Sequence, residues 1–179
     1  MNSPLTTLLG KQFDQVCFVV NDLDAAMDFH KKANGITAWN VAIDLAKDQT
    51  EKEYFGQPGD FQFSCAYGYA GETLFELARH DGGDSVYNDW LKQHGPGLHH
   101  IGFRQTDAED YARADAHYRN MGLSKAMAGL FQGPFGNCRW AYYDTRPFIG
   151  CYTELYYVDG EIAARMEQLK RGIAVSITR

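Results

Sequence analysis

The chain has 179 residues, a formal net charge of -6 and a pI of about 5.4, and it contains no run of basic residues. These values argue against partners such as nucleic acids and anionic membranes. The four cysteines are widely spaced, and no segment has the features of a signal peptide or a membrane span. We therefore expect free, buried thiols and a cytoplasmic protein.

The first half of the chain is predicted to form a βαβββ module over residues 13–96. Residues 13–20 are rich in β-branched and aromatic types, which suit a buried strand. A helix is expected to follow as far as Gly35, because acidic capping residues stand at its start. Further strands are predicted at 39–43, 61–67 and 73–78, and the polar run 44–60 between them is predicted to be a loop with at most one helical turn. A short linker helix completes the module.

The second half, residues 97–158, repeats this order. A strand is predicted over 98–103, a helix over 107–121, and strands around 126–131, 138–143 and 151–157. The pattern E-L-x-x-x-D-G occurs at Glu76 and again at Glu154, near the end of each module. Residues 159–179 are expected to form a final helix and a tail, so the chain is interpreted as one domain of two modules.

Four polar residues occupy equivalent positions in the two modules. Gln15 and His100 lie on the first strands, and Glu76 and Glu154 lie on the last. Burying unpaired charges in such apolar strands costs roughly several kcal/mol, so a binding partner must compensate these charges. A divalent metal ion binds carboxylates, a neutral imidazole nitrogen and an amide oxygen. The pattern therefore indicates a metal site in the concavity between the modules.

The chain resembles the vicinal oxygen chelate superfamily, the glyoxalase and methylmalonyl-CoA epimerase group. The resemblance is strongest at Leu98-His99-His100-Ile101-Gly102-Phe103, at residues 19–26 and at the two Glu-Leu strands. It implies an α+β fold in which two βαβββ modules form a half-open barrel around a metal ion, with Gln15, Glu76, His100 and Glu154 as ligands. Zinc, nickel, cobalt or manganese is expected, and iron less so. A homodimer is also implied.

The same resemblance implies an enzyme that moves a proton next to a carbonyl, as an isomerase, epimerase or lyase. Glu154 is the expected base, and Glu76 is the second carboxylate of the site. Strand alternation and neighbouring aromatic residues predict the pocket wall. It should consist of Cys17, Val19, Leu74, Gly102, Trp140, Tyr142, Tyr152 and Tyr156. Such a wall favours a small hydrophobic oxygenated substrate, because no cluster of cations for glutathione or coenzyme A is evident.

Other interpretations stay open at this point. His100 alone could be a core histidine, Glu76 could pair with an arginine, and the tyrosines could simply fill the core. Alternation directs His99 to the opposite face of its strand, as a helix-packing or hydrogen-bonding residue. A metal-free binding protein, like the bleomycin-resistance proteins, is one alternative function. An Fe(II) extradiol dioxygenase is less expected, because Gln15 replaces its second histidine.

Overall fold

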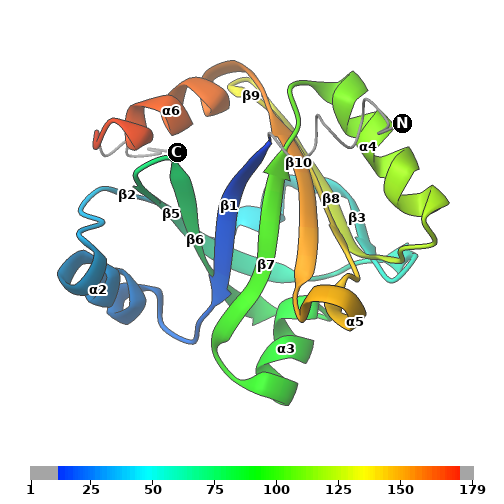
Figure 1. The fold of residues 1–179 in the computed structure, drawn as a ribbon, viewed down its shortest axis with the longest axis horizontal. Helices are drawn as coiled ribbons and strands as arrows, with labels where there is room; N and C mark the ends of the chain where they lie inside the picture. The colour runs from blue at the N-terminus through cyan, green and yellow to red at the C-terminus, as the bar shows by residue number, and fades with distance from the viewer. Residues whose placement is uncertain (1–11, 174–179) are drawn as a thin grey trace.

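A computed structural model describes residues 12–173, which form one mixed ten-stranded sheet with helices around it (Figure 1). The strand order across the sheet is β2-β5-β6-β1-β7-β10-β9-β8-β3-β4. The strands are β1 (Phe13–Val19), β2 (Trp39–Ala42), β3 (Gln49–Tyr54), β4 (Gln57–Pro58), β5 (Gln62–Ala70), β6 (Thr73–Gly82), β7 (Gly97–Arg104), β8 (Lys125–Gly133), β9 (Gly136–Tyr143) and β10 (Tyr152–Val158). The predicted α+β fold with a repeated βαβββ order is confirmed.

The two first strands, β1 and β7, pair antiparallel at the centre of the sheet, where the two halves of the chain meet. Each of them also pairs in parallel with the last strand of its own half, β1 with β6 and β7 with β10. Consequently the four strands predicted to carry the polar residues are consecutive neighbours, β6-β1-β7-β10.

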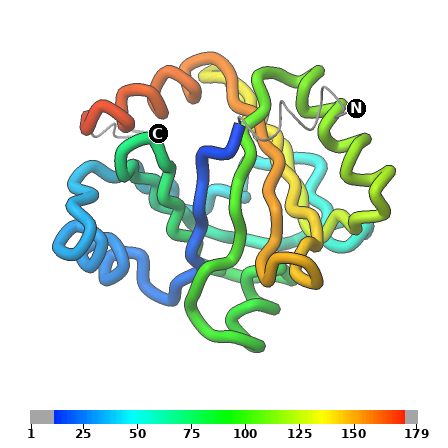
Figure 2. The backbone as a smooth tube through the Cα atoms, in the orientation of Figure 1, coloured from blue at the N-terminus to red at the C-terminus, as the bar shows by residue number. Residues whose placement is uncertain are grey.

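The sheet is strongly curled, because only a short connection joins strands that lie near its two ends. β2 lies at one end of the strand order and β3 almost at the other, yet only residues 43–48 separate them. In a flat sheet these strands would lie about 38 Å apart, at about 4.8 Å per strand. The connection from Ala42 to Gln49 spans at most about 25 Å. The sheet therefore forms a barrel open on one side, and this connection crosses the opening (Figure 2).

Two helices cover the outer face of the sheet. α2 (Leu23–Asn34) packs Leu23 against Ala66 and Leu77, and α4 (Ala108–Asn120) packs Tyr111 against the second half of the sheet. Both begin at an aspartate whose side chain accepts backbone N–H bonds, as the acidic starts predicted. α3 (Val86–His94) lies at one end of the barrel and α6 (Gly160–Lys170) at the other (Figure 1).

The polar run 44–60 differs from the prediction. It contains a 3-10 helix, η1 (Leu45–Asp48), and the strands β3 and β4, instead of a loop with one turn. β3 pairs with β8 of the second half, which supplies partners that lie far away in the sequence. A short helix, α5 (Arg146–Ile149), was also not predicted; Pro147 stands in its first turn.

Candidate metal centre

The side chains of Gln15, Glu76, His100 and Glu154 meet inside the barrel. Gln15 Nε2 lies 2.6 Å from Glu76 Oε2, 2.8 Å from Glu154 Oε2 and 3.0 Å from His100 Nε2. His100 Nε2 is 3.3 Å from each of the same two carboxylate oxygens. The repeat thus brings together four residues that are up to 139 positions apart in the sequence.

A glycine makes room for this arrangement. Gly102 of β7 is paired with Gln15 of β1 and also with Glu154 of β10. A Cβ atom at Gly102 would lie 2.7 Å from Gln15 Cβ and 3.2 Å from its Cδ. Gly102 therefore leaves room for the Gln15 side chain, which lies against β7 and contacts the other three residues. Rotation of its amide by half a turn would exchange Nε2 for the oxygen Oε1, which is the atom a cation needs.

All four side chains are buried, from 0% exposure for His100 to 6% for Glu154. Burial raises the pKa of Glu154, and the neighbouring His100 opposes this. For His100, burial alone would lower the pKa, but hydrogen bonds to Glu154 and Glu76 raise it to about 9. The site therefore concentrates negative charge that a cation in the middle would neutralise.

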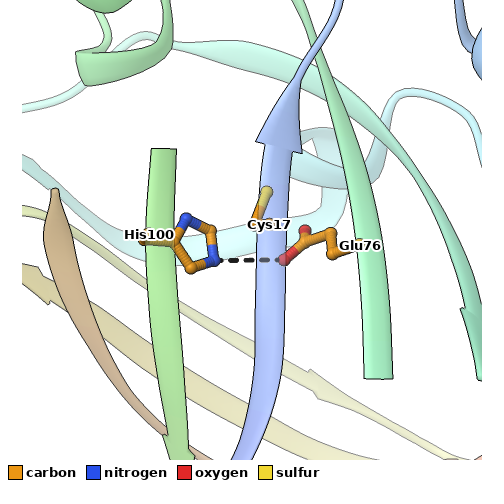
Figure 3. A group of neighbouring side chains, drawn as sticks. All are labelled: Cys17, Glu76 and His100. Atoms are coloured by element: carbon orange, nitrogen blue, oxygen red, sulfur yellow. Dashed lines mark ion pairs between the residues drawn. The ribbon is translucent and has the colours of Figure 1, made fainter. Parts of the chain in front are cut away.

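A thiol lies beside this group. Cys17 follows Gln15 by two residues on β1 and is paired with Glu76 on β6 and with His100 on β7. Ligand atoms of these three residues all lie within 4.8 Å of one another, and all three are buried (Figure 3). Burial and the nearby Glu76 raise the pKa of Cys17 well above its usual value. All four cysteines are free thiols, as the sequence predicted; three are buried as expected, and Cys138 is half-buried.

His99 does not lie on the opposite face of the strand, so this prediction is wrong. The pairing of β1 with β7 shifts between Cys17–His100 and Phe18–Leu98, and this β-bulge leaves His99 as the extra residue. The bulge turns His99 to the same side as His100, where their Nδ1 atoms lie 2.9 Å apart.

His99 also packs against a helix, as predicted. It is fully buried, and its ring contacts Tyr87 and Trp90 of α3. If His100 Nε2 faces a cation, His100 Nδ1 carries the proton and donates a hydrogen bond to His99 Nδ1. His99 is thus placed to orient the His100 ring.

A cavity of about 820 Å³ opens onto the centre. Gln15, Glu76 and Glu154 are part of its lining. The wall is largely apolar and includes Leu74, Tyr156, Trp140, Tyr142, Phe63 and Tyr67 from the strands, Leu45 from η1, Phe131 and Phe135 from the β8–β9 hairpin, and Ile162, Met166 and Leu169 from α6. Arg165 is the one cationic side chain in this lining among the described residues, and it is paired with Glu161 at 2.7 Å.

The predicted pocket wall overlaps this lining in part. Leu74, Trp140, Tyr142 and Tyr156 belong to it. Cys17, Val19 and Tyr152 instead pack in the hydrophobic core that surrounds the centre, while Gly102 lies under Gln15. The strand pattern did not reveal the residues of the hairpin and α6. For α6 the sequence does contain a signal, because the spacing of Ile162, Met166 and Leu169 gives this helix one apolar face.

A family model for the "Glyoxalase/Bleomycin resistance protein/Dioxygenase superfamily" matches residues 14–142, which contain three of the four converging side chains. The chain belongs to this superfamily. The match covers well over half of the sequence and both first strands, so the vicinal oxygen chelate resemblance is confirmed. No curated protein sequence matches the chain.

Several solved structures of this superfamily fold are similar to the chain. A methylmalonyl-CoA epimerase from Mycobacterium tuberculosis has 20% sequence identity and a TM-score of 0.57, covering 92% of this chain and 97% of its own. The Streptomyces coelicolor methylmalonyl-CoA epimerase in complex with 2-nitronate-propionyl-CoA has 21% identity and a TM-score of 0.54, covering 82% and 96%. A hypothetical protein from Bacillus halodurans has 15% identity and a TM-score of 0.55, covering 81% and 92%. At these identities the likeness establishes the fold. Within residues 12–173, no helix is long and apolar enough to cross a membrane.

Proposed function

We propose that this chain is a metal-dependent enzyme that transfers a proton next to a carbonyl, of the glyoxalase or epimerase type. The observation that carries the proposal is the convergence of Gln15, Glu76, His100 and Glu154 beside a largely apolar cavity that three of them line. Hydrophobic side chains would stabilise the core better than two buried carboxylates beside one histidine. The carboxylates therefore indicate a function.

The donor set fits a divalent cation. Ligands at about 2.1 Å from one ion lie about 3.0 Å apart when they are adjacent, and about 4.2 Å apart on opposite sides. The His100 Nε2 separations of 3.3 Å from both carboxylates match adjacent ligands. Gln15, Glu76, His100 and Glu154 would hold the ion, and zinc, nickel, cobalt or manganese suits this mixture of oxygen and nitrogen donors. A bound divalent ion supplies Lewis-acid polarisation of a substrate carbonyl.

The protein's own residues supply the remaining functions. Glu154 lines the cavity from β10, where its carboxylate could take a proton from the carbon next to the carbonyl and return it. The aromatic side chains Trp140, Tyr142 and Tyr156 would hold the body of the substrate and exclude water. Glu76 would stay with the ion as the second carboxylate.

The cavity favours a small substrate with a hydrophobic body. The described lining offers one cation, Arg165, and Glu161 already neutralises it. Several cations are needed to bind the phosphates of coenzyme A within a site. We therefore favour a hydrophobic oxo or hydroxy acid over the thioester methylmalonyl-CoA, which is named for the structural neighbours.

Two measurements test the proposal. Elemental analysis of the purified protein should find close to one divalent ion per chain, and His100→Ala should lose it. Incubation in D₂O with hydrophobic 2-oxo and 2-hydroxy acids, and with methylmalonyl-CoA, should then label a carbon next to the carbonyl of one compound. Glu154→Gln should lower the exchange rate by about 10²–10⁴-fold with an unchanged circular dichroism spectrum. Full exchange by Glu154→Gln would refute its role as the base.

A metal-free binding protein is the alternative that the largely apolar cavity itself favours. It predicts tight binding of a hydrophobic compound to protein treated with a chelator, with no exchange of deuterium. A homodimer and a cytoplasmic location stay predictions, and light scattering of the purified protein measures the first of them.

A further inference from the structure

Cys17 occupies a position that a core thiol does not need. Its strand lies between the strands of Glu76 and His100, and its pairing partners on the two sides are these two residues themselves. Figure 3 shows Cys17 on the strand between His100 and Glu76, with its sulfur above the dashed line that joins the imidazole and the carboxylate. A cation bound by Glu76 and His100 would therefore lie beside this sulfur.

The separations suit a shared ion. Zinc binds sulfur at about 2.3 Å and imidazole nitrogen at about 2.1 Å, so in its usual tetrahedral geometry two such ligands lie about 3.6 Å apart. The Cys17, Glu76 and His100 ligand atoms all lie within 4.8 Å of one another, so they would need to approach one another by at most about 1.2 Å. Small side-chain adjustments would bring all three onto one ion.

We propose that Cys17 is a further ligand of the metal centre and that its sulfur makes the site select zinc or cobalt over manganese and magnesium. This inference rests on the proposed function. Thiolate sulfur binds zinc and cobalt well, whereas manganese and magnesium favour oxygen ligands. On binding, the S–H bond breaks, the sulfur–metal bond forms and the proton leaves for solvent, so no oxidant or reductant is needed.

Cys65 provides a matched control. It lies on β5, in the same hydrophobic core, and is as fully buried as Cys17. Its partners across the strands are Ala78 and Ala42, and its thiol contacts Glu76 as that of Cys17 does. It is nevertheless not a member of the group formed by Cys17, Glu76 and His100. Substitution of Cys65 therefore measures the cost of removing a buried thiol near the site, without removing the proposed ligand.

The test is the absorption spectrum of the protein loaded with Co²⁺. Thiolate ligation gives an intense near-ultraviolet charge-transfer band, and the visible d–d bands report bound cobalt whatever its ligands. The wild-type protein and Cys65→Ser should show both features. Cys17→Ser and Cys17→Ala should keep the visible bands and lose the charge-transfer band. In competition titrations these two variants should lose about tenfold or more in Zn²⁺ affinity, with Mn²⁺ affinity within about threefold of wild type.

Each other outcome has a distinct meaning. Visible cobalt bands without a charge-transfer band in the wild-type protein would overturn the role of Cys17 and leave the metal site intact. A charge-transfer band that survives in both Cys17 variants would overturn this role in the same way. If the wild-type protein binds no cobalt and no zinc, both this inference and the proposed function fail. Circular dichroism of the two Cys17 variants separates loss of the ligand from loss of the fold.

Discussion

Gly102 lies directly across from Gln15, and a methyl group added to it would come within 2.7 Å of Gln15 Cβ. We expect Gly102→Ala to push the Gln15 side chain out of the centre, because β1 and β7 are paired and cannot separate easily. Metal affinity should fall about tenfold or more, and the free energy of unfolding by about 1–3 kcal/mol. Titration with Zn²⁺ and urea unfolding measure the two effects.

Gly97 is the control for this substitution. It lies on the same strand, and a Cβ atom there would meet nothing within 4 Å. Gly97→Ala should leave the metal affinity unchanged. Equal losses in both variants would contradict the idea that Gly102 acts by making room for Gln15.

His99→Ala should weaken metal binding by about 10–100-fold, because the His100 ring loses the partner that fixes its orientation. Trp90→Phe disturbs the packing of the same His99 ring and keeps the bond between the two histidines. Calorimetric titration with Zn²⁺ should separate the two variants. A loss of the same size in Trp90→Phe would mean that His99 matters only for packing.

Met166→Trp should obstruct the cavity, since Met166 is part of its lining on α6. We expect affinity for the hydrophobic substrate to fall at least about tenfold, while metal content stays the same. Ala164→Trp places the same side chain on the exposed side of α6 and should have no effect. Unchanged substrate binding in Met166→Trp would mean that the substrate lies elsewhere.

Asp115 should make the fold sensitive to acid, independently of the centre. Burial alone would raise its pKa, but Tyr143 and Lys125, followed by Arg119, lower the pKa below its usual value of 3.8. A pKa that is lower in the folded state stabilises the protein above about pH 4, and this stability is lost as the pH falls through the folded value.

Asp115→Asn should therefore cost roughly 1–3 kcal/mol at pH 7 and flatten the dependence below about pH 4. Urea unfolding of both proteins from pH 3 to pH 7 measures this. Parallel curves for the variant and the wild type would show that another carboxylate is responsible.

The sequence predicted the convergence of Gln15, Glu76, His100 and Glu154 because they occupy equivalent positions on the first and last strands of the two modules. For His99 the prediction relied on strand alternation alone. It failed at His99, since one extra residue in a bulge reverses that alternation and no pattern in Leu98-His99-His100 marks the bulge. The resemblance to the superfamily did not correct this error, because it carried over only His100.

β3 could not be predicted from its own residues. Gln49-Thr50-Glu51-Lys52-Glu53-Tyr54 is polar and does not alternate, and Glu51 has a positive φ of 49° that interrupts the strand. Its partner β8 lies about 80 residues away, so local propensity does not reveal the pairing. The predicted cavity wall was incomplete for a related reason. The apolar spacing on α6 is visible in the sequence, but the sequence does not show which surface this helix covers.

The pairing of β3 with β8 also determines when the cavity can form during synthesis. β3 emerges from the ribosome long before β8. Its backbone N–H and C=O groups that bond to β8 therefore stay unpaired until β8, which ends at residue 133, has been made. The pairing of β3 with β8 thus forms late in folding, because it joins residues far apart in the sequence. The two repeats resemble each other, yet the first cannot complete its fold without the second and could not be exchanged as a free-standing unit.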